Sequence, residues 1–146
     1  MKILSKKRKK NNKGFSLVEL IVVVLIIAII AVALAPQVMK WVKTAKDNVD
    51  ENNMASIKSS MQIAIADFES YGNVLQNTTF KILDSDVEIT SPTPHTQNQT
   101  KLKNFVNEVF GGSYPKPSDS SKHYVAVITV KADSTVLENI TVSIQP

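Results

Sequence analysis

The sequence contains no cysteine and only two histidines, His95 and His123. The chain can therefore form no disulfide, and no zinc site of ordinary ligand spacing can be written from these histidines. His95 stands in a stretch rich in proline and threonine, and His123 precedes a β-branched run, so both are interpreted as surface residues. A glycine-rich phosphate loop and a nucleophile paired with a base are also missing. The sequence thus predicts no catalytic residue, no metal site, no cofactor and no enzymatic activity.

Residues 84–88 carry acidic side chains at alternating positions, as calcium-binding loops do. Ile89, however, occupies the position at which such a loop needs glycine, and no glutamate follows at the distance of the bidentate calcium ligand. Calcium binding by Asp84, Asp86 and Glu88 is therefore disfavoured.

The most prominent feature that is present is one long apolar run. Sixteen uninterrupted apolar residues extend from Leu20 to Ala35. The 21 residues from Phe15 to Ala35 would form a helix about 30 Å long, which is the thickness of the hydrocarbon core of a bilayer. A strand is excluded because strands rarely exceed about ten residues. We therefore predict a membrane-spanning helix over residues 15–36.

Basic residues precede this run. Residues 1–14 hold 7 of the 17 lysines and arginines and no acid, so this leader is the source of the positive net charge of +4. In the rest of the chain ten lysines face 13 acids, a formal charge of −3. The positive-inside rule places the leader in the cytoplasm and the C-terminal domain outside. A nucleic-acid-binding arm is disfavoured because the basic residues adjoin a membrane span directly.

Glu19 is the only charged residue between Leu17 and Ala35. A carboxylate inside a lipid-facing helix costs at least about 2.5 kcal/mol, so a functional role with a cationic partner is expected. The nearest basic residue, Lys13, lies beyond Gly14. A cut after Gly14 would create a new α-amino group at Phe15, about one helical turn from Glu19. The two groups could then neutralise each other, within a subunit or between neighbours.

The heptapeptide that begins at Gly14, with its basic leader and apolar run, resembles the class III signal of type IV pilins and pseudopilins. The resemblance implies that a prepilin peptidase cuts after Gly14 and methylates the new amino terminus at Phe15. It also implies that Glu19 meets the Phe15 amino group of a neighbouring subunit during assembly. Pro36 stands where many pilins carry a proline. Ala28 departs from the pattern, because many pilins have a helix-breaking glycine there, so local melting of the helix rests on Pro36.

Two other interpretations of the N-terminal segment remain open. An ordinary secretory signal would be cut after Ala31-Val32-Ala33 or Ala33-Leu34-Ala35. Against it, Glu19 would lie within the apolar region, the run exceeds the usual 7–15 residues or so, and Pro36 would follow the second site. A plain single-pass anchor is the other interpretation, and it leaves Glu19 unexplained.

Beyond Pro36 the pattern predicts an α+β domain of the pilin-like kind, with the long N-terminal helix packed on a small antiparallel sheet. Apolar residues recur at steps of three and four over residues 37–71, which predicts an amphipathic second half of one helix from Phe15 to Tyr71. A kink is expected at Pro36 and a stop at Gly72. The stripe of this second half is Val38, Val42, Ala45, Val49, Met54, Ile57, Met61, Ala64, Ile65 and Phe68.

Residues 72–121 are predicted to form a connection that contains a helix over Lys101–Phe110 and a polar loop over Thr90–Thr100. A C-terminal β-hairpin is predicted over residues 122–145, with strands Tyr124–Val130 and Asn139–Gln145 and a turn at Asp133–Ser134. Because two strands are not stable alone, a third short strand is expected between Phe80 and Ile89. No internal repeat is present.

The first functional hypothesis is a structural subunit of a type IV pilus, for adhesion, motility or a related surface function. The resemblance implies a homo-oligomeric helical filament assembled from the cytoplasmic membrane by a prepilin peptidase, an assembly platform protein and an ATPase. The alternatives are a pseudopilin of a type II secretion system, a subunit of a competence pilus, or a secreted binding domain with an ordinary signal. Nucleic-acid binding is expected only in the competence case. Many Gram-negative pilins close a C-terminal loop with a disulfide, so the missing cysteines favour a Gram-positive producer.

Overall fold

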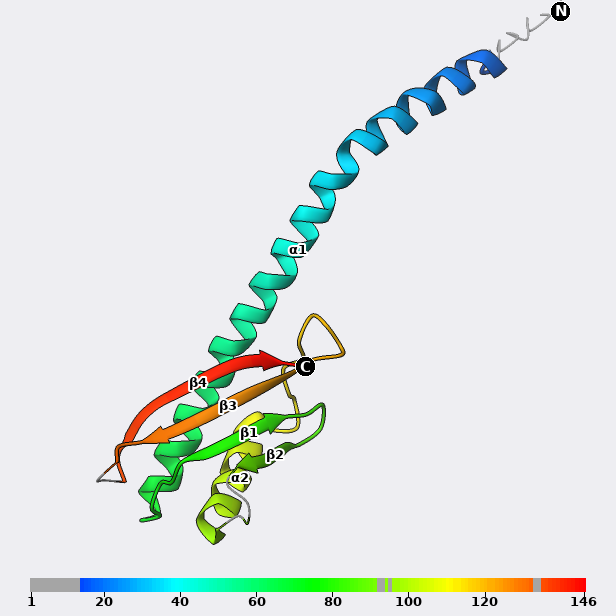
Figure 1. Ribbon diagram of the computed structural model, residues 1–146. Coiled ribbons are helices and arrows are strands. Elements are labelled where there is room, and N and C mark those ends of the chain that lie inside the picture. The colour runs from blue at the N-terminus through cyan, green and yellow to red at the C-terminus, as the bar shows by residue number, and fades with distance from the viewer. Residues whose placement is uncertain (1–13, 92–93, 95, 133–134) are drawn as a thin grey trace, which may run out of the picture. The chain divides into compact units, whose positions relative to one another are not determined.

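The computed structural model describes residues 14–91, 94, 96–132 and 135–146. The elements, in chain order, are α1 (Leu17–Ser70), β1 (Thr78–Ile82), β2 (Val87–Ser91), α2 (Gln97–Phe110), β3 (His123–Val130) and β4 (Leu137–Gln145) (Figure 1). This arrangement confirms the predicted α+β class. The chain divides into two compact units, Met1–Val42 and Lys43–Pro146. The basic residues of the leader, His95 and the predicted turn at residues 133–134 lie outside the described residues.

Within the first unit, α1 is apolar and exposed. The helix begins at Leu17, and the carbonyl oxygen of Ser16 accepts the hydrogen bond of Leu20 N–H at 3.1 Å. Among the described residues, α1 is the one helix that is long and apolar enough to cross a membrane, judged by length and composition. None of its most apolar window is buried within the chain. These side chains therefore need an apolar environment that the chain itself does not supply.

The bounds of α1 agree closely with the predicted helix from Phe15 to Tyr71. Pro36 lies inside α1, where the missing N–H removes one backbone hydrogen bond, and the helix continues on both sides of it. The kink at Pro36 stays a prediction. Gly72 ends the helix as predicted: its φ is 73°, a left-handed value that favours glycine, and its N–H donates to Glu69 O at 2.8 Å.

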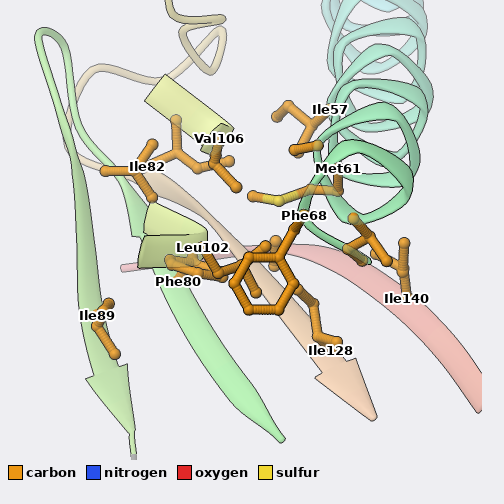
Figure 2. Close-up of a cluster of buried hydrophobic side chains, with 14 of the residues drawn as sticks. Ile57, Met61, Phe68, Phe80, Ile82, Ile89, Leu102, Val106, Ile128 and Ile140 are labelled. Carbon is orange, nitrogen blue, oxygen red and sulfur yellow. The ribbon is translucent and has the colours of Figure 1, made fainter. Parts of the chain in front are cut away.

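Within the second unit, one stripe of α1 packs on the sheet. The buried residues of α1 are Ile57, Met61, Ala64, Ile65 and Phe68, as the spacing predicted. Met54 is half-buried at the edge of this core, whereas Val49 is exposed, so the buried part of the stripe is shorter than predicted. Figure 2 shows side chains from α1, α2 and the sheet meeting in one cluster. Both helices therefore cover the same face of the sheet.

The sheet has four antiparallel strands in the order β2-β1-β3-β4. β3 is interior, as its apolar composition predicted, and Ala126 pairs with Phe80 on one side and Val142 on the other. β4 is an edge strand. Its Ile140 is buried, and Val142 and Ile144 are half-buried against the core, which confirms the predicted inward face.

The number of strands differs from the prediction of one short strand between Phe80 and Ile89. The structure has two, β1 and β2, joined by a tight turn in which Leu83 N–H donates to Asp86 O at 2.9 Å. Each strand shows only three alternating residues in the sequence, which is too short a pattern to identify a strand alone. β1 is stabilised by pairing with β3 on one side and β2 on the other, and β2 is stabilised by pairing with β1 and by contact with α2. Residues 72–121 therefore contribute half of the sheet.

α2 begins at Gln97, four residues before the predicted start at Lys101, and this shortens the predicted polar loop. Thr96 is the N-cap: its Oγ1 accepts from Gln99 N–H at 3.3 Å, while Gln99 Oε1 accepts from Thr96 N–H at 2.8 Å. This reciprocal capping box satisfies two N–H groups that a helix end leaves free. The predicted end at Gly111 is confirmed, where φ is 56°.

A polar clamp fixes the loop Ser113–Lys122 to α1. Asp50 Oδ1 accepts from Ser118 N–H at 2.7 Å and from the hydroxyl of Tyr124 at 3.1 Å. Ser118 Oγ donates to Lys46 O at 3.1 Å, and Asn53 Nδ2 donates to Lys116 O at 3.1 Å. Asp50 and Asn53, two polar residues between Val49 and Met54 of the apolar stripe, thus hold this loop. Burial, more than any other cause, raises the pKa of Tyr124, so its hydroxyl stays a donor.

Replacing Asp50 with alanine is expected to destabilise the second unit by about 1–2 kcal/mol, because the buried Tyr124 hydroxyl and Ser118 N–H lose their acceptor. Asp47→Ala is the matched control, since Asp47 lies on the same helix, is exposed and makes no hydrogen bond or ion pair with a described residue. Urea denaturation of the full chain in a non-ionic detergent measures both. Equal midpoints for the two variants would contradict the clamp.

Candidate functional site

Gly14 lies in the extended segment ahead of α1 and is exposed. A Cβ added at this position would meet no heavy atom within 4 Å, and its φ is not in the left-handed region. Neither space nor backbone conformation therefore requires glycine here. This contrasts with Gly72 and Gly111, where a positive φ does. If Gly14 has a role, recognition by another protein is the explanation that remains.

Phe15 and Glu19 lie at the beginning of α1. The Phe15 side chain is 79% exposed, and Glu19 is the acidic residue of the first helical turn. A carboxylate there is favourable, because the N-terminal end of the helix macrodipole is positive. The dipole would oppose an ammonium group at Phe15, so a free amino terminus at this position would gain from a nearby carboxylate.

Glu19 has no hydrogen bond or ion pair with any described residue, and its side chain is exposed. In water, an exposed carboxylate without a partner carries no free-energy penalty. In the hydrocarbon region the same carboxylate costs about 2.5 kcal/mol or more unless it is paired. Among the described residues no lysine pairs with Glu19, so the candidate partners are the amino group that cleavage would create and a group of another molecule.

The structure brings three of the predicted site residues together and leaves the fourth apart. Gly14, Phe15 and Glu19 share the segment that leads into the first turn of α1, whereas Pro36 lies far along the same helix. Their roles in processing, assembly and kinking stay predictions.

Asp84 and Asp86, two of the acids considered for calcium, accept hydrogen bonds from lysine and asparagine side chains. Asp86 Oδ2 accepts from Lys103 Nζ at 2.7 Å and Asp86 Oδ1 accepts from Asn107 Nδ2 at 2.6 Å, while Asp84 Oδ2 accepts from Lys116 Nζ at 2.8 Å. The hydrogen bond from Lys103 is the largest cause that lowers the pKa of Asp86. Among the described residues, no group of three or more His, Cys, Asp or Glu side chains could hold a metal ion. The carboxylates instead tie the β1–β2 turn to α2 and to the following loop.

Comparison with known proteins gives one match. The family model of the prokaryotic N-terminal methylation motif matches residues 9–35. No curated protein and no solved structure matches the chain.

The matched segment defines the class of protein. The chain carries the class III signal shared by type IV pilins and pseudopilins, and its long apolar helix on a small antiparallel sheet is consistent with the pilin fold. The motif therefore indicates a pilin-like or pseudopilin-like protein and points to a structural subunit rather than an enzyme.

Proposed function

We propose that this chain is a structural subunit of a type IV pilus, held in the cytoplasmic membrane by α1 and polymerised through α1 into an extracellular filament. The observation that carries the proposal is Glu19, an unpaired carboxylate in the first turn of an apolar helix, inside the matched N-terminal methylation motif. In this role a prepilin peptidase removes residues 1–14. The carboxylate then gains the Phe15 amino group as its partner.

The proposed processed chain has two functional parts. Residues 15–36 span the membrane before assembly and form the filament core afterwards, with a kink at Pro36. Residues 37–146 form the extracellular domain. The basic residues ahead of the span support a cytoplasmic N-terminus, because the positive-inside rule retains such residues in the cytoplasm.

Polymerisation in this proposal exchanges lipid contacts for contacts between apolar helices. Lipid tails are about as apolar as Leu, Ile and Val side chains, so the hydrophobic effect supplies little net driving force. Assembly therefore requires an energy source, which in this class of protein is an ATPase that acts through a platform protein in the membrane. Pairing of Glu19 with the Phe15 amino group of a neighbour would fix the register between subunits.

N-terminal sequencing and intact-mass measurement of the protein in sheared surface fibres test the proposal. The expected first residue is Phe15, with a mass increase of one methyl group. A first residue beyond position 30 would indicate an ordinary signal peptide and contradict the proposal. Mature protein that stays in the membrane, with no long surface fibre by electron microscopy, would contradict the pilus assignment while leaving a pseudopilin role.

A further inference from the structure

A cleft of ≈ 450 Å³ lies within the second unit, between the turn that follows β1 and the loop Ser113–Lys122. It is well separated in the sequence from the processing site, and the proposed function assigns it no role. Its lining includes two lysines, a histidine, two hydroxyl groups and proline rings: Lys81, Ser85, Pro115, Ser120, Lys122 and His123.

The strand register explains why cationic side chains gather here. Lys81 of β1 pairs with Val125 of β3, and His123 is two residues before Val125 on the same strand. Lys81 and His123 are therefore diagonal neighbours on one face, about 7–8 Å apart at the backbone. Ile82 and Tyr124, which alternate with them, are buried in the core on the opposite face. Lys81 and His123 thus project from the face that α1 and α2 leave uncovered.

The two lysines of this cleft have no short ion pair. Lys81 makes no hydrogen bond or ion pair with a described residue, although the exposed Glu88 of β2 is its cross-strand partner. Lys122 has only a long contact with Asp119, 3.7 Å between Nζ and Oδ2, and the one acid in the lining, Asp84, is paired with Lys116. Burial first, and the charge of Lys81 second, lower the pKa of His123. The cleft therefore presents a cation and an imidazole N–H with no bound acceptor.

Both walls of the cleft are fixed in place. The loop is held to α1 by the clamp at Asp50, and its Lys116 is bonded to Asp84 of the opposite wall at 2.8 Å. Pro115 and Pro117 restrict the backbone of the loop further. A ligand would meet a preformed site and would not need to order either wall, which lowers the entropic cost of binding.

We propose that this cleft binds an organic phosphate or sulfate ester, with its anionic group between Lys81, Lys122 and His123. A tetrahedral anion offers acceptor oxygens in several directions, which suits donors that come from two strands and a loop. Pro115 and the partly exposed Leu83 provide an apolar wall for the organic part. This inference is independent of the pilus assignment, since it needs only the fold of the second unit.

Imidazole NMR of the full chain in dodecyl maltoside, a non-ionic detergent, tests the proposal. A His95→Gln background leaves His123 as the only histidine. Glycerol 3-phosphate and sodium sulfate are each titrated against sodium chloride of equal ionic strength. Saturable movement of the His123 resonances is expected. Sulfate should also raise the pKa of His123, because a bound anion stabilises the imidazolium, and sulfate itself keeps its charge throughout the titration. The other charges near this part of the sheet are those of Lys81, Lys122, Asp84, Glu88 and Asp119.

Matched lysine variants decide whether binding in the cleft causes the movement of the His123 resonances. Lys81→Gln should weaken binding about tenfold, the loss of roughly one charge-assisted hydrogen bond. Lys101→Gln removes an exposed lysine of α2 whose Nζ bonds Asn73 Oδ1 at 3.4 Å, outside the cleft, and should leave binding unchanged. Saturation by both anions supports an oxyanion site, and saturation by glycerol 3-phosphate alone narrows it to organic phosphates. No saturable response, or equal losses in the two variants, would overturn the proposal.

Discussion

Replacing Glu19 with alanine is expected to leave the protein inserted in the membrane and processed, but absent from filaments. The substitution removes the only charge of the apolar segment, so insertion becomes easier. The proposed cleavage site precedes Phe15, so cleavage is expected not to need the carboxylate. Assembly does, because the Phe15 amino group of a neighbouring subunit would enter an apolar filament core with no counter-charge. Immunoblots of membrane and sheared-fibre fractions, with electron microscopy of the cell surface, measure the loss.

Conservative variants separate charge from shape at this position. Glu19→Asp keeps the carboxylate and should retain part of the assembly, whereas Glu19→Gln keeps the shape and should fail like alanine. Glu51→Ala is the control on the same helix, since Glu51 is exposed and lies in the second unit. Normal fibres in Glu19→Ala cells would remove the role assigned to this residue.

Replacing Gly14 with serine is expected to abolish processing and therefore all assembly. The folded chain tolerates the substitution, because a Cβ at Gly14 meets no atom within 4 Å and the backbone φ is not left-handed. A loss of processing in this variant would therefore be caused by failed recognition by the peptidase. The precursor should accumulate in the membrane with residues 1–14 attached, which intact-mass measurement detects directly.

The two variants serve as controls for each other. Gly14→Ser should be inserted and uncut, whereas Glu19→Ala should be inserted and cut, although both lack fibres. A mature mass in Gly14→Ser cells would place the cleavage site elsewhere.

Local signals predicted those parts of the fold that depend on neighbouring residues. The end of α1 at Gly72, the end of α2 at Gly111 and the alternation of β4 all follow from the conformational needs of a few adjacent residues. The start of α2 was predictable too, since Thr96 and Gln99 form a capping box at the standard spacing. The apolar spacing of α2 begins only at Leu102, so periodicity alone places the start of the helix too late.

Long-range pairing explains what the sequence could not predict. β1 is a strand because it pairs with β3, which begins more than 40 residues later in the chain, and β2 is a strand because it pairs with β1. The bond between Asp50 and Ser118 joins residues 68 positions apart, so no local pattern reveals it. The proposed processing site was accessible to sequence reasoning because Gly14, Phe15 and Glu19 are nearly consecutive. The proposed anion cleft was not, because it depends on the register between β1 and β3.

The position of β1 inside the sheet also sets the order in which the domain can be completed. β1 lies between β2 and β3, and a chain delivered N-terminus first presents β1, β2 and α2 well before β3. Until β3 arrives, the β1–β2 hairpin leaves the backbone N–H and C=O groups on the free edge of β1 unpaired. Another incomplete chain could pair with this edge. Subunits released too quickly or too close together would therefore aggregate through β1, and a slow, one-by-one delivery protects against it.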